Sequence, residues 1–447
     1  MIEYKVPISD VADCVSDCML DLFYSNGDKY VKHDKLNVLS LFSGCGGMDI
    51  GFEGGFICHK KSVPTLSKIE RAISNDWVLL KKNRFHTVFA NDILPEAQKT
   101  WLKYMRRFEK EPDMYHLESV VNLIKLHESG HKIFPNNIDV VTGGFPCQDF
   151  SVAGKRKGFE SEVLHDGKKN YEDSTKFENR GRLYYWMKQV IDIVKPKMFV
   201  AENVKGLVSL GDVKNIIQRD FASAGDGGYV VLDPVVLNAG DYGVPETRER
   251  VIFIGIKKSA LREEVRLAFE SHDLPDSLSP FPNPTHNYTI GDEGLSAPVT
   301  CEDILKELKE PEESNDNSQK FYSKAKYMGA HCQGQTEINL HGLGPTIRSE
   351  HHGNIEYRRL SVEHGGKNVE ELAMGLKERR LTPRECALIQ TFPPDYPFVF
   401  YKGHTSKLEV SPSMAYKVIG NAVPPVLAYN IACRIESLWN TYFGKDE

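Results

Sequence analysis

The sequence lacks the features of membrane, secreted and metal-binding proteins. No apolar run is long enough to span a bilayer. The N-terminus carries several aspartates and no basic segment ahead of a hydrophobic stretch, so we expect no signal peptide. Nine cysteines are scattered without a CxxC pair, which argues against a disulfide framework or a zinc site and predicts a reducing cytoplasm. His351-His352 is not metal spacing for a helix, so we expect no metal.

The chain also lacks a net positive charge. The formal net charge is −6, so any role with nucleic acid must rest on local basic patches and not on a long-range field. The 447 residues are 40% hydrophobic and 26% charged, which is ordinary for a soluble globular protein. At this length we expect two or three domains, with residues 1–35 as a polar extension that contains one short helix at 11–23.

The stretch at 139–151 is the most informative part of the chain. It begins as a strand of β-forming residues, runs into Gly143-Gly144, and then presents Pro146-Cys147. A thiol on a glycine-rich turn at the carboxyl end of a strand lies where open α/β sheets bind their ligands. A small buried hydrophobic residue is the alternative interpretation of Cys147.

A second ligand-binding edge is predicted upstream. Residues 36–42 read as a buried parallel strand that ends in a turn rich in glycine, although the turn matches G-x-G-x-x-G imperfectly. Residues 87–92 read as another strand, with Asp92 where a nucleotide-binding fold places a carboxylate for ribose hydroxyls. A tight connection and a solvated loop aspartate remain the alternatives. Residues 57–84 show no clear strand pattern, and we interpret them as an insertion.

Further elements follow the same α/β pattern. We expect strands at 198–201, before Glu202-Asn203, at 229–237 and at 251–256, and helices at 97–108, 183–194, 213–222 and 426–439. Glu118-Ser119 would close a further strand. Thr382 is a candidate N-cap, with Pro383 as the first helical residue. The long polar segment after Cys147 is typical of a lid or binding loop, and its basic residues suit a phosphate backbone.

Six motifs occur in order: Phe-Ser-Gly-Cys-Gly-Gly (42–47), Gly-Phe-Pro-Cys-Gln (144–148), Glu-Asn-Val (202–204), Arg-Glu-Arg (248–250), Arg-Glu-Cys (384–386) and Gly-Asn-Ala-Val (420–423). This set resembles the cytosine-C5 DNA methyltransferase family over most of residues 36–440. The resemblance implies an α/β, S-adenosylmethionine-dependent methyltransferase fold of Rossmann type with a mostly parallel sheet. It also implies a catalytic and cofactor-binding domain at 36–257, a smaller irregular target-recognition domain at 258–378, and a return segment at 379–447 that completes the catalytic domain.

The resemblance implies a covalent mechanism. Cys147 would add as a thiolate to C6 of cytosine, because C5 alone is a poor nucleophile. Glu202 would hold N3, which requires a carboxyl whose pKa is raised by burial. Arg248 and Arg250 would contact the base O2 and position neighbouring groups. Glu202 as a structural ion-pair partner, and the two arginines as surface charge, remain the alternatives.

The resemblance also implies a pocket for S-adenosyl-L-methionine. Its expected residues are Phe42, Gly44, Gly46, Asp92, Glu118, Pro146, Leu183 and Asn421. Asp92 would hold the ribose, and Glu118 would meet the adenine amino group. Two departures from the family pattern stand out: Leu-Glu-Ser at 117–119 replaces the usual Gly-Asp-Ile, and Glu246 replaces a common glutamine.

Double-stranded DNA is the expected substrate, and the target base must leave the stack to reach a thiol. The expected DNA-binding residues are Gln148, Ser151, Lys155, Arg156, Lys157, Thr346, Arg348, Arg358 and Arg359. We expect a cytoplasmic monomer that protects DNA from a partner restriction endonuclease where one exists. The alternatives are a tRNA-directed relative and a catalytically silent DNA-binding paralogue. A nicotinamide dehydrogenase would leave Pro146-Cys147 and Glu202-Asn203 unexplained.

Overall fold

The structure is a computed structural model that describes residues 27–63, 65–146, 183–209, 211–271, 274–332, 334–349 and 355–444. Some sequence predictions lie outside these residues. They are the helix at 11–23 and the site residues Cys147, Gln148, Ser151, Lys155, Arg156 and Lys157.

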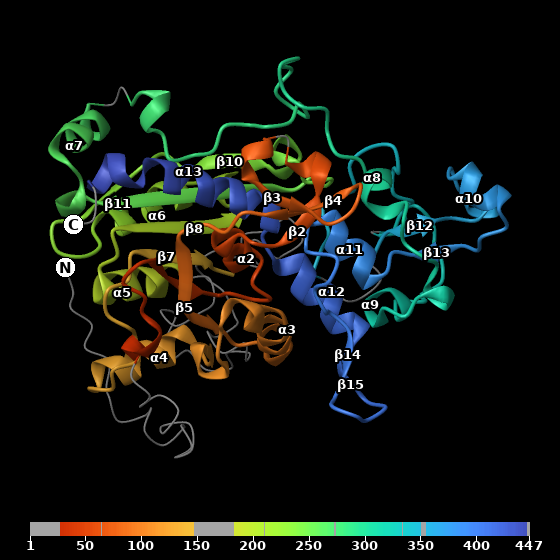
Figure 1. The fold of residues 1–447 in the computed structure, drawn as a ribbon, viewed down its shortest axis with the longest axis horizontal. Coiled ribbons are helices and arrows are strands. Elements are labelled where there is room, and N and C mark those ends of the chain that lie inside the picture. Colours follow the sequence, from red (N-terminus) through yellow and green to blue (C-terminus); the bar gives the residue numbers. More distant parts are fainter. Residues whose placement is uncertain are drawn as a thin grey trace.

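A mixed sheet lies at the centre of the described chain (Figure 1). Its strands are β1 (Leu36–Leu41), β5 (Phe85–Asp92), β6 (Tyr115–Leu117), β7 (Val140–Gly144), β8 (Met198–Val204), β9 (Tyr229–Val231), β10 (Val235–Asn238) and β11 (Glu249–Lys257). They hydrogen-bond in the order β10-β11-β8-β7-β1-β5-β6, and β9 also pairs with β11. The five strands from β8 to β6 pair in parallel, whereas every pairing of β11 is antiparallel. The predicted α/β class with a mostly parallel sheet is confirmed.

Two hydrophobic cores cover the two faces of this sheet. Side chains alternate along β11, so that Ile252 and Ile254 belong to one core while Val251 and Phe253 belong to the other. The first face is covered by α2 (Gly47–Glu53), α3 (Pro95–Met105) and α13 (Pro425–Phe443). The second is covered by α4 (Val120–Glu128), α5 (Leu183–Val194) and α6 (Val213–Ala222). Figure 1 shows α13 above the sheet and α4 and α5 below it.

A second lobe, residues 301–380 as far as they are described, lies at one end of the molecule (Figure 1). It contains α8 (Cys301–Leu305), α9 (Asn317–Lys320), α10 (Val369–Ala373) and the paired strands β12 (Tyr357–Arg359) and β13 (Arg379–Arg380). The chain then returns through α11 (Pro383–Ile389), the hairpin β14 (Phe400–Tyr401) and β15 (Leu408–Val410), and α12 (Pro412–Asn421).

The residues that follow β11 do not enter the second lobe at once. Helix α7 (Glu263–Glu270) lies at the opposite end of the molecule (Figure 1). There Arg262 N–H donates to the Tyr442 carbonyl at 2.8 Å, and the Phe269 ring packs on Tyr442. Residues 258–271 therefore pack on α13.

One expected strand is wrong, and one small sheet was not expected. Residues 57–84 contain a small antiparallel sheet, β2 (Ile57–His59), β4 (Trp77–Leu80) and β3 (Ile69–Ala72), whose strands are too short to show a period in the sequence. This sheet meets the second lobe through ion pairs of Lys61 with Asp303 at 2.6 Å and of Lys306 with Asp76 at 2.9 Å. The strand expected at 229–237 is two strands, β9 and β10, because Pro234 lies between them and has no N–H to donate.

Most other elements match their predictions. The helices at 183–194 and 213–222 have the expected bounds, and the helix at 97–108 is α3 followed by a short 3-10 turn. Thr382 is the N-cap of α11, with its hydroxyl oxygen accepting the Glu385 N–H at 3.1 Å. In the part of the chain that the structure describes, no helix is long and apolar enough to cross a membrane.

Candidate active site

The chain order reverses between β1 and β7, and this is where an open α/β sheet leaves a crevice for ligands. From β1 the chain proceeds to β5 and β6 on one side, and then to β7 and β8 on the other. The carboxyl ends of these strands carry Phe42, Asp92, Glu118, Pro146 and Glu202. These five predicted site residues therefore lie along one edge of the sheet.

The turn after β1 has the backbone that its glycines permit. Gly44 and Gly46 have φ angles of 55° and 82°, in the left-handed region. A Cβ on Gly46 would lie 2.7 Å from the Trp101 ring, so that position also requires a glycine for space. Two tyrosine hydroxyls fix the backbone of the turn. Tyr115 donates to the Gly44 carbonyl at 2.9 Å, and Tyr396 donates to the Cys45 carbonyl at 2.6 Å.

Asp92 is fixed against this turn. One carboxylate oxygen accepts the Gly44 N–H at 3.0 Å, and the other accepts the Leu94 N–H at 3.0 Å. Burial raises the pKa of Asp92, although these backbone donors oppose the shift. Each oxygen keeps a lone pair after accepting one hydrogen bond. The Ile93 N–H is a third backbone donor to this carboxylate, so Asp92 keeps one open acceptor position for a ligand hydroxyl.

Glu118 lies at the end of β6, one residue before the N-cap of α4. Its Oε1 accepts the Ser119 N–H at 2.6 Å and the Asn122 amide at 2.9 Å. The Asn91 amide donates to the Glu118 carbonyl at 2.6 Å, so β5 and β6 are tied together at the site. Sequence reasoning missed Ile93, which is 41% exposed directly after Asp92. The signal in the sequence is an apolar residue directly after the aspartate that ends a strand, and its exposed side chain could pack on an aromatic base.

These residues fit an adenosyl cofactor. A Cβ on Gly44 would meet no atom within 4 Å, so there is open space beside the turn. The 420–422 segment borders the turn, because a Cβ on Gly47 would overlap the Val423 carbonyl oxygen. Asn421 is exposed at the end of α12, whereas Leu183 is 4% exposed within the core. Acceptors, an apolar surface and open space are thus present together.

Glu202 and Arg250 form a buried ion pair at the carboxyl end of β8. Arg250 Nε lies 2.6 Å from Glu202 Oε1, and the two residues are 9% and 7% exposed. Burial raises the pKa of Glu202, although Arg250 and Arg248 oppose the shift. This is the direction that a carboxyl needs in order to hold a proton near neutral pH.

Strand β7 brings Gly144 beside this carboxyl. Gly144 pairs with Glu202 in the parallel register of β7 and β8. A Cβ on Gly144 would lie 2.9 Å from Glu202 Oε2, so a side chain there would displace the carboxyl. Asn203 donates to the Phe145 carbonyl at 3.1 Å and so fixes the peptide that leads to Pro146. Cys147 itself lies outside the described residues.

Arg248 differs from Arg250 in its surroundings. It is 0% exposed, and its guanidinium donates to the carbonyls of Ile347 at 2.9 Å and of Gly420 and Ala422 at 2.8 Å. The predicted contact of Arg248 with the base O2 would require it to leave these carbonyls. A positioning role is the one that this geometry favours.

Comparison with known proteins identifies the family. The family described as C-5 cytosine-specific DNA methylase matches residues 36–437. The chain belongs to this family. It resembles the type II methyltransferase M.BspRI of Lysinibacillus sphaericus, with 34% identity over 438 residues that cover 95% of this chain and 87% of that protein. It also resembles M.BsuRI of Bacillus subtilis, with 33% identity over 415 residues that cover 90% and 79%.

The fold has a counterpart among solved structures. The Entamoeba histolytica methyltransferase EhMeth has a TM-score of 0.50 and 15% identity, and the likeness covers 91% of this chain and 99% of that one. At this identity the likeness supports the fold alone.

The family assignment makes the protein a DNA cytosine-5-methyltransferase, referred to below as the methylase.

The predicted DNA-binding residues of the second lobe are half-buried or buried. Thr346 is half-buried, and its hydroxyl donates to the Thr247 carbonyl at 2.7 Å. Arg348 is also half-buried. Arg358 and Arg359, which are also predicted to bind DNA, are buried, with 7% and 1% of their surface exposed.

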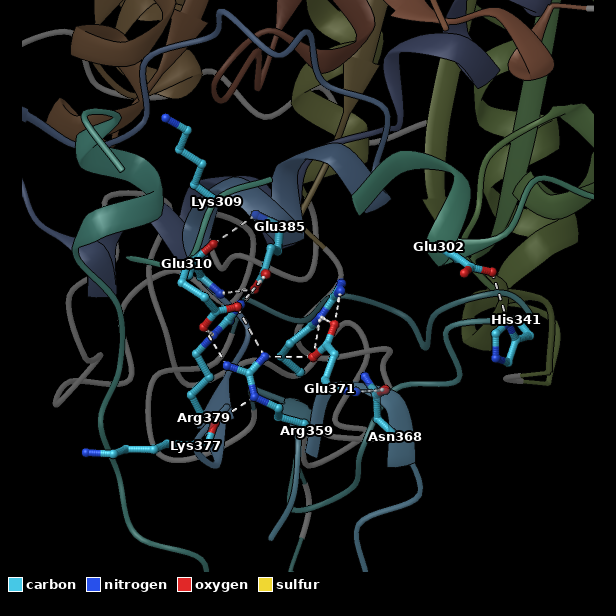
Figure 2. Close-up of polar contacts among 12 residues, drawn as sticks. Glu302, Lys309, Glu310, His341, Arg359, Asn368, Glu371, Lys377, Arg379 and Glu385 are labelled. Carbon is cyan, nitrogen blue, oxygen red and sulfur yellow. Dashed lines mark hydrogen bonds and ion pairs between the residues drawn. The ribbon is translucent and has the colours of Figure 1, made fainter. Parts of the chain in front are cut away.

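Arg358 and Arg359 belong to a chain of ion pairs, most of which Figure 2 shows. Arg358 and Arg359 both pair with Glu371, and Arg359 also pairs with Glu310. The chain continues from Glu310 through Arg379 to Glu385 of α11, with both of these contacts at 2.9 Å. The guanidinium groups of Arg358 and Arg359 are already paired with carboxylates, so binding a phosphate would require them to leave these partners.

Proposed function

We propose that the methylase transfers a methyl group from S-adenosylmethionine to C5 of a cytosine flipped out of duplex DNA, within one short recognition sequence. The observation that carries this proposal is the buried Glu202–Arg250 pair beside Gly144, at the strand ends that lead into Pro146-Cys147. Burial raises the pKa of this carboxyl, which lies beside Gly144, and Cys147 of the family motif follows Gly144 three residues later in the sequence.

The chemistry follows from these groups. The Cys147 thiolate adds to C6, and the pair of electrons displaced from the C5–C6 bond makes C5 nucleophilic. The Glu202 carboxyl donates a hydrogen bond to N3, where negative charge develops. Arg250, held against Glu202, faces the same base edge and contacts O2. The cofactor supplies an electrophilic methyl group, and loss of the C5 proton followed by release of Cys147 restores the ring.

Cofactor binding is assigned to the edge between β1 and β6. Asp92 accepts a hydrogen bond from a ribose hydroxyl, and Glu118 accepts one from the adenine amino group. The turn at 42–46 approaches the methionine part, and Pro146, Leu183 and Asn421 border the pocket. The open space beside Gly44 and the exposed face of Ile93 support this assignment.

DNA binding is assigned to the loop after Cys147 and to the second lobe. Gln148, Ser151 and the basic residues 155–157 would follow the flipped nucleotide and its backbone. Thr346 and Arg348 remain the recognition candidates of the second lobe. The relatives are named type II methyltransferases, so we propose that the methylase acts as a monomer that protects DNA from a partner endonuclease.

The test is methyl transfer from labelled S-adenosylmethionine to unmethylated duplex DNA and, in parallel, to tRNA, with modified cytosines mapped by bisulfite sequencing. Label at C5 within one short DNA motif is the expected result. Label on tRNA alone would move the protein to an RNA substrate. Cofactor binding without transfer to either nucleic acid would instead indicate a silent DNA-binding paralogue.

A further inference from the structure

Part of the second lobe is laid directly along the segment that precedes β11. Gly344 N–H donates to the Pro245 carbonyl at 2.9 Å, and Thr247 N–H donates back to the Gly344 carbonyl at 2.9 Å. The Thr346 hydroxyl adds the bond to the Thr247 carbonyl. Residues 344–348, called here the recognition segment, thus pair as a short strand-like ladder with residues 245–248.

Glu246 and Arg248 bind the two backbone polar groups of one residue in this segment, Ile347. Glu246 Oε1 accepts the Ile347 N–H at 2.6 Å, and Arg248 donates to the Ile347 carbonyl at 2.9 Å. Both side chains are 0% exposed. The backbone polar groups of Ile347 are therefore committed to a carboxyl and a guanidinium that come from the catalytic part of the chain.

The same guanidinium reaches the border of the cofactor pocket. Arg248 Nη2 donates to the carbonyls of Gly420 and Ala422, both at 2.8 Å, and Asn421 lies between these two residues. A Cβ on Gly420 would overlap the carbonyl carbon of Arg348, so the two backbones touch. Residues 420–422, called here the cofactor segment, are thus packed against the recognition segment with Arg248 between them.

We propose that Glu246 and Arg248 join the recognition segment to the cofactor segment, and that Arg248 acts on methyl transfer by positioning these two segments and not by touching the target cytosine. The proposal rests on the proposed function for the identity of the two ligands. Only arginine presents a planar fork that can donate to three carbonyls from two directions at once. A shift of either segment is therefore transmitted to the other, and the affinities for cofactor and DNA are coupled.

The test compares Arg248→Lys with Arg250→Lys, with Arg266→Lys as a control at an exposed position on α7. The affinity for S-adenosylhomocysteine is measured by calorimetry, alone and with a duplex that contains the methylation site, beside kcat on that duplex. Arg248→Lys should weaken S-adenosylhomocysteine binding at least tenfold and bring the effect of DNA on that affinity close to none. Arg250→Lys should lower kcat and leave S-adenosylhomocysteine affinity within about twofold, because the polar partners of Arg250 are the Glu202 carboxyl and the Glu249 carbonyl.

Two further variants keep the proposal testable if Arg248→Lys does not fold. Thr346→Val removes the hydrogen bond between the Thr346 hydroxyl and the Thr247 carbonyl, at a residue that does not bond to the cofactor segment. Weaker S-adenosylhomocysteine binding in this variant would show the proposed connection between the recognition segment and the cofactor segment, called here the joint. Glu246→Gln keeps an oxygen acceptor for the Ile347 N–H and should restore what Glu246→Ala loses. Amide hydrogen exchange at Ile347 should slow when S-adenosylhomocysteine binds to the wild type.

The contrary results are equally specific. Wild-type S-adenosylhomocysteine affinity and wild-type coupling in Arg248→Lys, with only kcat reduced, would make Arg248 a base-contacting residue and overturn the joint. Unchanged S-adenosylhomocysteine affinity in Thr346→Val and Glu246→Ala would also overturn it. A wild type that binds S-adenosylhomocysteine but methylates no DNA would refute the proposed function. The S-adenosylhomocysteine affinities of Arg248→Lys, Thr346→Val, Glu246→Ala and Glu246→Gln would still show whether the two segments are joined.

Discussion

Arg250→Met tests whether Glu202 exchanges a proton inside the folded methylase. The ion pair is short, at 2.6 Å, and both partners are less than one-tenth exposed. Removing one partner of a buried pair costs about 3–5 kcal/mol of unfolding free energy when the other charge is left behind. Burial already raises the pKa of Glu202, so the lone carboxylate can be relieved by taking up a proton. The cost of the substitution must then depend on pH.

The sign follows from linkage. Without Arg250 the pKa of Glu202 rises further, because the guanidinium is one of the groups that hold it down. At a pH below the pKa in both proteins, Glu202 is neutral in both, and the difference shrinks to lost contacts of about 1 kcal/mol. At higher pH the wild type has an ion pair and the variant has either a bare carboxylate or a bound proton. The difference in unfolding free energy should therefore grow as the pH rises from 4.5, the ordinary pKa of a glutamate carboxyl, into the alkaline range.

The measurement is urea denaturation of both proteins across that pH range. The double variant Glu202→Gln/Arg250→Met is the control, because without a titrating carboxyl its stability relative to Glu202→Gln should not vary with pH. Arg266→Met, on the exposed surface of α7, should stay within about 0.5 kcal/mol of wild type at every pH. A difference between wild type and Arg250→Met that is constant across the range would show that Glu202 does not titrate, and would remove the basis for its role at N3.

Four further predictions can be checked separately. Cys147→Ala should abolish transfer while calorimetry still finds cofactor binding; loss of binding would indicate a structural thiol. Gly144→Ala places a methyl group 2.9 Å from Glu202 Oε2 and should lower kcat at least tenfold with cofactor affinity unchanged, whereas normal turnover would mean that the carboxyl can move at no cost. Glu310→Gln should cost about 2–3 kcal/mol of unfolding free energy near pH 7; hydrogen bonds from two arginines hold the pKa of Glu310 near 2 against burial, so this cost should fade as urea titrations approach that pH. Exchange of residues 258–378 with those of a relative should change the methylated sequence, and an unchanged sequence by bisulfite mapping would refute the domain assignment.

Features that depend on neighbouring residues were predicted well from the sequence. The helix at 383–389 begins at Thr382 because a hydroxyl at the N-cap and a glutamate three residues later satisfy each other's backbone donors, and both contacts are present. The strand ends carrying Asp92 and Glu202 were predicted because buried parallel strands read as continuous apolar runs.

Features that depend on distant partners were not predictable. Arg359 pairs with a glutamate 49 positions away, and Gly344 pairs with residues near 245. Short-range patterns carry no information about such partners, so a buried arginine and an exposed one look alike in the sequence. The strands of the small sheet, β2 to β4, were missed for a related reason. Three or four residues cannot establish an alternation, and their stability comes from pairing and packing.

The burial of its arginines limits how the second lobe can attract DNA. Arg358, Arg359 and Arg379 share three carboxylates, those of Glu371, Glu310 and Glu385, so the chain is electrically balanced and contributes little field at the distance of a phosphate. With a net charge of −6 over the whole protein, counterion release on binding must come from other lysines and arginines. What the ion-pair chain supplies is rigidity, because it ties α10 and β12 through β13 to α11. Sequence discrimination then depends on residues that this frame holds in place, and the recognition segment is in addition fastened to Glu246 and Arg248, next to the strand that carries Arg250.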